Sequence, residues 1–84
     1  MKEKEILKNL TEYLVRELLP SNTDIKIEQI DSETDTVIRV LVPSDIISTI
    51  IGKGGSIANS IRTIVQAASY NKKFGRVRIN IDSL

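Results

Sequence analysis

The most informative segment of the sequence is residues 50–57, which reads Ile50-Ile51-Gly52-Lys53-Gly54-Gly55-Ser56-Ile57. Three of the chain's four glycines lie here within four consecutive positions, and a lysine stands between them. Glycine adopts positive φ readily and has no Cβ that would keep a ligand away from the backbone. A lysine among such glycines indicates an anionic ligand. Residues 52–55 are therefore the first candidate for a binding site.

Composition limits the classes of protein to which the chain can belong. Its 84 residues, 40% hydrophobic and 27% charged, suit one small folded domain and argue against disorder. Without cysteine there is no disulfide, thiolate metal site or cysteine nucleophile, and without histidine the commonest general base and metal ligand are missing. We therefore expect no enzymatic activity, no cofactor and no metal.

No stretch of the sequence suggests a membrane or an export signal. No apolar run approaches the roughly 18 residues that a membrane span needs. The charged residues 1–5 lack the apolar core of a signal peptide. We expect a cytoplasmic protein with no membrane partner.

Charge is distributed unevenly along the chain. Residues 1–42 carry 6 basic and 9 acidic side chains, a balance of −3, whereas residues 43–84 carry 6 basic and 2 acidic ones, a balance of +4. The basic half contains the glycine stretch. This asymmetry favours an anionic partner for that half, although an ordinary solvated surface would also account for it.

An amphipathic helix is expected near the start of the chain, over about residues 2–19. Its apolar residues recur with a spacing close to 3.6. Pro20 ends the helix, and the polar residues 21–24 predict a turn. The expected apolar positions are Ile6, Leu7, Leu10, Tyr13, Leu14 and Leu18.

A hairpin of two strands is expected next. Apolar and polar residues alternate over residues 25–28, which is the pattern of a half-buried strand. The polar residues 31–35 predict the turn, and residues 36–42 are apolar at nearly every position, as in a central strand. In that strand the inward positions are Ile38, Val40 and Val42, and the outward ones are Val37, Arg39 and Leu41.

Two helices and a last strand complete the chain. Pro43 ends the strand, and Ser44 is expected to cap a short helix that the glycine stretch then interrupts. A longer helix follows over about residues 56–70, then a loop at 71–75 and an alternating strand at 76–82. The apolar residues of the two helices are Ile46, Ile47, Ile50 and Ile51, and then Ile57, Ala58, Ile61, Ile64, Val65 and Ala68.

The predicted order of elements is α-β-β-α-α-β, in a single α+β domain over residues 1–84. The second and third strands are joined through helices, so they should form a parallel pair with a right-handed crossover. The result is a three-stranded mixed sheet that three helices cover on one face.

Two nucleotide-binding motifs do not fit the glycine stretch. A P-loop requires G-x-x-x-x-G-K-[ST] after a strand, but position 47 is isoleucine, Gly54 follows Lys53, and the preceding segment is helical. A dinucleotide-binding motif requires G-x-G-x-x-G in a βαβ unit, but position 57 is isoleucine. The remaining interpretation is G-x-x-G between two helices, with Gly52 and Gly55 as its glycines.

This G-x-x-G stretch resembles the V-I-G-x-x-G core of KH domains, whose loop clamps about four nucleotides. The order of elements resembles the type II arrangement of bacterial KH domains. The run Ile50-Ile51-Gly52-Lys53…Ala58-Asn59-Ser60-Ile61-Arg62-Thr63 is similar to the small stand-alone bacterial KH proteins of the KhpA family, and the resemblance covers essentially the whole chain. Ala58 departs from the bulky aliphatic residue of many KH domains.

The resemblance implies a groove beside the loop, between the two central helices and the sheet edge with the loop before the last strand. Lys53 and Gly54 would contact phosphate, Gly52 and Gly55 would set the loop conformation, and the helix that begins at Ser56 would add its N-terminal dipole. The walls would comprise Ile47, Ile51 and Ile57 on one side, and Lys72, Lys73, Arg76 and Arg78 on the other.

Each of these wall residues also has an alternative role. The isoleucines could belong to the core, and Lys72 and Lys73 could be ordinary solvated charges. The chain has one phenylalanine, two tyrosines and no tryptophan, and none of them lies in the loop. Bases are therefore expected to lie against isoleucine side chains rather than on an aromatic platform.

The function that the resemblance implies is non-enzymatic binding of single-stranded RNA, in a post-transcriptional regulator or RNA chaperone. A short site with few charged contacts binds weakly, and linking several sites offsets this weakness. A homodimer is expected, and the resemblance adds a heterodimer with a larger, KhpB-like KH protein. The alternative is a protein-interaction scaffold with little intrinsic RNA binding. Lys53 favours RNA, because a scaffold needs no exposed lysine between glycines.

Overall fold

The order of elements is α-β-β-α-α-β, as predicted. The computed structural model describes residues 5–84, so residues 2–4 of the predicted first helix lie outside the described part. The elements are α1 (Glu5–Leu18), β1 (Lys26–Asp31), β2 (Asp35–Val42), α2 (Ile47–Ile51), the 3-10 turn η2 (Lys53–Gly55), α3 (Ser56–Lys72) and β3 (Arg76–Ser83).

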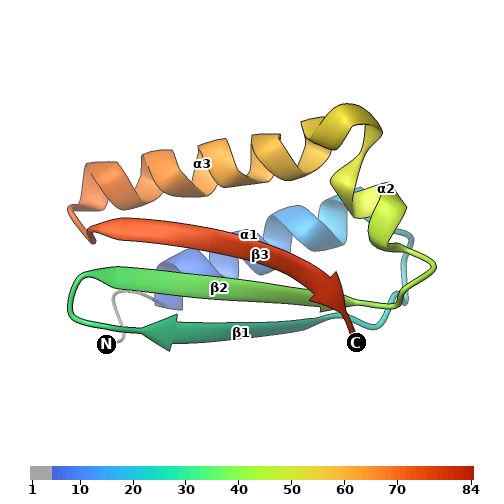
Figure 1. Cartoon of the computed structure of the whole chain (residues 1–84), viewed down its shortest axis with the longest axis horizontal. Coiled ribbons are helices and arrows are strands. Elements are labelled where there is room, and N and C mark those ends of the chain that lie inside the picture. Colours follow the sequence, from blue (N-terminus) through green and yellow to red (C-terminus); the bar gives the residue numbers. More distant parts are fainter. Residues whose placement is uncertain (1–4) are drawn as a thin grey trace.

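The three strands form one mixed sheet in the order β1-β2-β3, with β2 in the centre. β1 and β2 form the predicted antiparallel hairpin, which the bond from Ser32 N–H to Asp35 O closes at 2.8 Å. β2 and β3 are parallel, also as predicted, and Ile38 lies opposite Ile79 in their register. The crossover between them runs through α2 and α3 (Figure 1).

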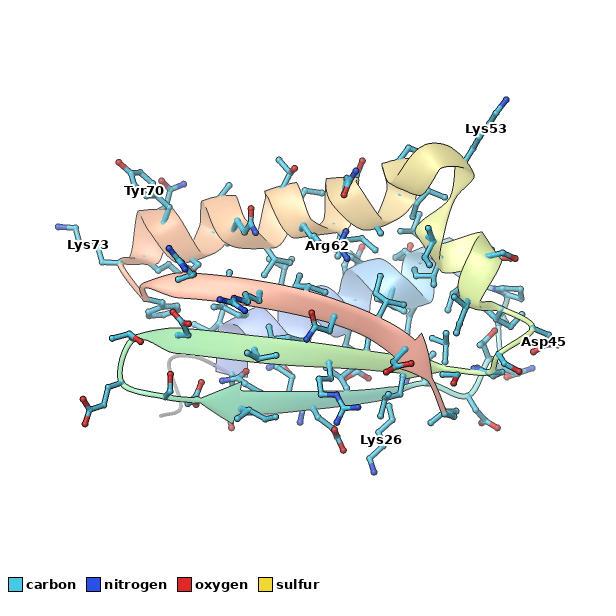
Figure 2. All side chains as sticks on the ribbon, viewed as in Figure 1. Lys26, Asp45, Lys53, Arg62, Tyr70 and Lys73 are labelled. Atoms are coloured by element: carbon cyan, nitrogen blue, oxygen red, sulfur yellow. The ribbon has the colours of Figure 1, made fainter. Side chains whose placement is uncertain are left out.

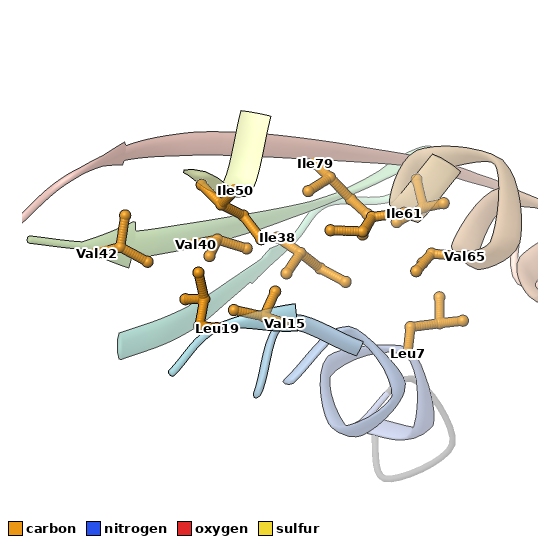
Figure 3. Close-up of a cluster of buried hydrophobic side chains, with 11 residues drawn as sticks. Leu7, Val15, Leu19, Ile38, Val40, Val42, Ile50, Ile61, Val65 and Ile79 are labelled. Carbon is orange, nitrogen blue, oxygen red and sulfur yellow. The ribbon is translucent and has the colours of Figure 1, made fainter. Parts of the chain in front are cut away.

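The alternation of side chains along β2 separates the two faces of the sheet. Every second residue of β2 is buried and its neighbours are only half-buried, so the predicted inward and outward positions are confirmed. In Figure 1 α1 lies behind the sheet and α3 runs alongside β3. Figure 3 shows buried side chains of α1 and of the sheet meeting in one layer. The buried core comprises Leu7, Val15, Leu19, Ile38, Val40, Val42, Ile50, Ile61, Val65, Val77 and Ile79.

The buried face of α1 differs from the predicted one. Leu7 is buried as expected, but Thr11 and Val15 are also completely buried. The Thr11 hydroxyl donates a hydrogen bond of 2.8 Å to Leu7 O, so its polar group is satisfied within the core. A prediction based on hydrophobicity does not identify a threonine as a core residue. Three residues assigned to the apolar face are instead 46–62% exposed: Ile6, Tyr13 and Leu18.

The starts and ends of the central helices also differ from the prediction. Ser44 is not a helix cap, because residues 44–46 form a turn in which Ile46 N–H donates to Pro43 O at 2.9 Å. α2 therefore begins only at Ile47 and has no side-chain cap. α3 runs two residues beyond the predicted end at Tyr70. Ile64, which was placed on its apolar stripe, is 46% exposed.

Candidate functional site

The glycine stretch forms an exposed turn between α2 and α3. Gly52 has φ 78° and ψ 175°, a backbone region that is almost restricted to glycine. A Cβ at Gly52 would lie 2.7 Å from Ile57 Cγ1, so no side chain fits there. Gly54, with φ 64°, would have nothing within 4 Å of its Cβ. The two positions therefore differ: Gly52 is packed against the protein, whereas Gly54 faces open space.

The tip of this turn presents unused donors. The hydrogen bonds of the turn use the N–H groups of Gly52, Gly55 and Ser56, and none of those found among residues 5–84 uses the N–H of Lys53 or Gly54. Lys53 is exposed, and its side chain projects away from the protein (Figure 2). The first turn of α3 contains no acidic residue. Backbone donors, a helix N-terminus and an ammonium group together make this tip suited to an anion.

Three predicted isoleucines flank the tip. Ile47, Ile51 and Ile57 are each half-buried and pack against the core, whereas Ile50 is completely buried. Each of these side chains thus contributes to the core, and the part that remains exposed is accessible to a ligand. They leave an apolar surface next to the donors of the turn.

Arg62 joins α3 to the edge of the sheet. Its Nε–H donates to Ile79 O on β3 at 3.2 Å, and Nη1 donates to Asn59 Oδ1 at 3.0 Å. Ile79 lies on β3, which pairs with β2 alone, so Arg62 bridges the helix and an edge strand. Arg62 was absent from the predicted site. The sequence did offer one signal for it: a cation that follows the apolar Ile61, on a helix that must pack against the sheet, lies at the border of that contact.

Lys72 and Lys73 of the predicted basic wall lie far from the glycine turn. Lys72 ends α3, and Lys73 follows it in the left-handed conformation with φ 60°. In Figure 2 Lys53 and Lys73 lie at opposite ends of α3. A helix of 17 residues is about 25 Å long, so these lysines are not brought opposite the loop. The basic residues predicted as the second wall of the groove are therefore spread along α3 and β3, and do not lie opposite the turn.

A hollow of about 710 Å³ lies at this far end, between α3 and the start of β3. Three of its lining residues were predicted site residues, namely Lys73, Arg76 and Arg78. Gln66 and Tyr70 also line it and were missed in the sequence. Gln66 and Tyr70 are four positions apart, so they lie on neighbouring turns of the same side of α3. This spacing in the sequence could have indicated that they belong to one surface.

The cations of the turn and of the hollow are not neutralised by ion pairs. The ion pairs found in residues 5–84 are Arg16–Glu12, Lys26–Glu28 and Arg39–Glu28. None of them involves Lys53 or a cation of the hollow. The positive charge of the second half of the chain is therefore available along both ends of α3.

The geometry agrees with the match to known proteins. A family model described as KhpA/KhpB, KH domain, matches residues 8–81. The chain belongs to the KhpA/KhpB KH-domain family. The type II KH fold that the sequence predicted is thereby confirmed together with its element order.

Relatives in the KhpA/KhpB family match nearly from end to end. The protein named RNA-binding protein KhpA from Oceanobacillus iheyensis is 36% identical over 90% of this chain and 97% of its own length. The protein of the same name from Clostridium perfringens is 32% identical over 80% of this chain and 92% of its own length.

Solved structures show the same fold as this KhpA/KhpB-family chain. Era in complex with MgGDPNP and a segment of 16S ribosomal RNA has a TM-score of 0.63 and 14% identity, over 94% of this chain. Era from Aquifex aeolicus, bound to GDP and AlF4-, has a TM-score of 0.59 and 20% identity. This chain spans 30% of the length of either Era chain, so the likeness concerns the fold alone.

Between residues 5 and 84 no group of three or more aspartate, glutamate, histidine or cysteine side chains is placed to hold a metal ion. Over the same residues, none of the helices combines the length and the apolar character that crossing a bilayer requires.

Proposed function

We propose that the protein binds single-stranded RNA without catalysis, as a post-transcriptional regulator or RNA chaperone. The observation that carries this proposal is the turn at residues 52–55, where positive φ at Gly52 and Gly54 exposes two backbone donors beside Lys53. Its relatives, which bear the name RNA-binding protein KhpA, support the same class of ligand.

The turn would act as a phosphate clamp. The N–H groups of Lys53 and Gly54 donate to phosphate oxygens, the Lys53 ammonium adds a mobile charge, and the N-terminus of α3 at Ser56 adds its dipole. Gly55 sets the left-handed step that starts α3. Such contacts hold the strand in place but carry no sequence information.

Base contacts would be made beside the clamp. The accessible parts of Ile47, Ile51 and Ile57 give an apolar surface for about four nucleotides. Arg62 extends this surface toward β3. A guanidinium has five N–H donors, and only two bonds from Arg62 are made within the described protein, so donors remain for a base or phosphate.

The basic end of the groove would hold the strand further along. Lys72, Lys73, Arg76 and Arg78 are all exposed, and the last three line the hollow between α3 and β3. About 25 Å separates the two ends of α3. These residues therefore contact phosphates several nucleotides away from the one held by the turn.

The protein would act with partners in the cytoplasm. We propose a homodimer and a heterodimer with a larger KhpB-like KH protein, because linked sites compensate for a weak single site. The open face of the sheet is the candidate surface. It carries Ile30, which is 54% exposed and lies opposite the half-buried Val37, and further along β2 it carries the half-buried Leu41. These apolar groups also favour the second candidate function, a dimerisation scaffold with little RNA binding.

The test of the clamp is a pair of double substitutions at its tip. Lys53→Asp with Gly54→Asp places two negative charges where phosphate would lie. The matched control, Lys53→Arg with Gly54→Asn, keeps the cation. It makes the same demand on the backbone, since aspartate and asparagine both tolerate positive φ. Circular dichroism should show both variants folded.

Binding to short single-stranded RNA, measured by fluorescence anisotropy, should be lost in the aspartate variant and kept in the control. Undiminished affinity of the aspartate variant would show that the turn is not the site. An unmodified protein that binds no RNA, yet forms a stable homodimer or KhpB-type complex, would establish the scaffold function instead.

A further inference from the structure

One of the residues that line the hollow at the end of α3 is an aromatic residue that is not part of the core. Tyr70 is 82% exposed, the highest value among the exposed large hydrophobic residues of the described chain. It stands at the rim of the hollow, next to Lys73 at the end of α3 that is remote from Lys53 (Figure 2). Packing therefore does not explain a tyrosine here, and an exposed ring offers a face for stacking.

The other groups around the ring suit a nucleotide. Lys73, Arg76 and Arg78 supply cations for a phosphate. Gln66, one turn before Tyr70, supplies an amide with donors and an acceptor for the edge of a base. The volume of about 710 Å³ falls in the usual range for small-ligand sites. An aromatic face beside cations is also how proteins bind single strands without strict sequence preference.

Acidic neighbours do not cancel this charge. Asp35 lies opposite Arg76 in the strand register, but no ion pair between them is found among residues 5–84. The strand register thus places one carboxylate, that of Asp35, opposite one of the three cations. The balance at the hollow favours an anion.

We propose that this hollow is a second nucleotide subsite for the RNA strand held at the glycine turn. In this subsite a base stacks on Tyr70 while Lys73 and Arg78 hold a phosphate. The inference rests on the proposed function. Tyr70 lies 14 positions after Ser56, about 21 Å along the helix axis. At roughly 3.4 Å for each nucleotide, the rise along one strand of a double helix, this distance corresponds to about six nucleotides.

The first test compares RNA lengths. A ten-nucleotide strand reaches both sites, whereas a four-nucleotide strand fills only the turn. Tyr70→Ala should weaken binding of the ten-nucleotide strand by about tenfold, from the usual contribution of stacking one base, and leave the shorter strand unaffected. Tyr70→Phe should restore the affinity, because it keeps the ring. Tyr13→Ala is the matched control, since Tyr13 is 62% exposed on α1 and does not line the hollow.

The second test observes the ring directly. The chain has two tyrosines and no tryptophan, so Tyr13→Phe leaves Tyr70 as the sole tyrosine fluorophore. The ten-nucleotide strand should quench its emission and the four-nucleotide strand should not. Adenosine monophosphate, added alone, tests whether the hollow takes a free nucleotide. Quenching by the mononucleotide but not by the strand would overturn the proposal.

The outcomes separate this inference from the function on which it rests. If Lys53→Asp/Gly54→Asp abolishes binding of both strands while Tyr70→Ala behaves like Tyr13→Ala, the clamp stands and the second subsite is wrong. If the aspartate variant still binds the ten-nucleotide strand at full affinity, the clamp itself is wrong. Loss of self-association in Tyr70→Ala with unchanged RNA affinity would make the hollow a protein contact and also overturn the subsite.

Discussion

Gly52→Ala should destabilise the protein more than any other glycine substitution in the turn. Two costs combine at this position. A residue other than glycine at φ 78°, ψ 175° costs about 1–3 kcal/mol in backbone strain. The new Cβ would lie 2.7 Å from Ile57 Cγ1 and 2.9 Å from its Cβ, and moving a packed side chain adds about 1–2 kcal/mol.

The expected loss is therefore about 2–5 kcal/mol of unfolding free energy. For a domain of this size each kcal/mol lowers the melting temperature by about 4–8 °C, so a decrease of at least about 8 °C is expected. Gly54→Ala is the control, because Gly54 also has positive φ but a Cβ added there would have no atom within 4 Å. Its cost should stay near 1–2 kcal/mol.

Urea unfolding followed by circular dichroism measures these differences. A double-mutant cycle isolates the contact: in the Ile57→Ala background, Gly52→Ala should cost about 1 kcal/mol less than in the unmodified protein. Equal destabilisation by Gly52→Ala and Gly54→Ala, with no coupling to Ile57, would refute the argument from close approach.

Two further predictions concern Arg62 and Lys53. Arg62→Ala removes the hydrogen bond to Ile79 O and should cost about 0.5–1.5 kcal/mol in urea unfolding, a modest value because the group is half-exposed. A loss below about 0.3 kcal/mol would mean that the bridge to the edge strand has no structural role. Lys53→Gln should reduce the slope of log binding constant against log salt concentration by about 0.7, the value for one phosphate contact on a single strand. An unchanged slope would place Lys53 away from the phosphates.

The element order and the glycine turn could be predicted because their signals are local. The nearly continuous apolar run of residues 36–42 indicates a central strand, its single charged residue Arg39 indicates the outward face, and Pro43 marks its end. Gly52 and Gly55 identify the turn between two helices through their spacing alone. None of these inferences requires knowledge of residues distant in the sequence.

The predictions that failed have different causes. Thr11 is buried where α1 packs against the core, and its hydroxyl is satisfied within the helix by Leu7 O, which hydropathy does not register. Ser44 fails as a cap because one extra turn precedes α2. Arg62 contacts Ile79 across 17 positions, so its position after Ile61 could indicate that it borders the sheet but not which residue it contacts. The distance of Lys73 from the turn reflects the full length of α3, which is two residues longer than predicted.

The parallel pairing of β2 and β3 also has a consequence for the time at which the binding site forms. The proposed clamp and both central helices lie inside the crossover that connects these two strands, and β3 follows all of them in the chain. Contacts between segments so distant in sequence form late, because closing the intervening segment costs entropy before the contacts stabilise it. During synthesis, the surfaces on either side of the clamp can assemble only after β3 has left the ribosome. The newly made chain should therefore gain its affinity for RNA in a single late step.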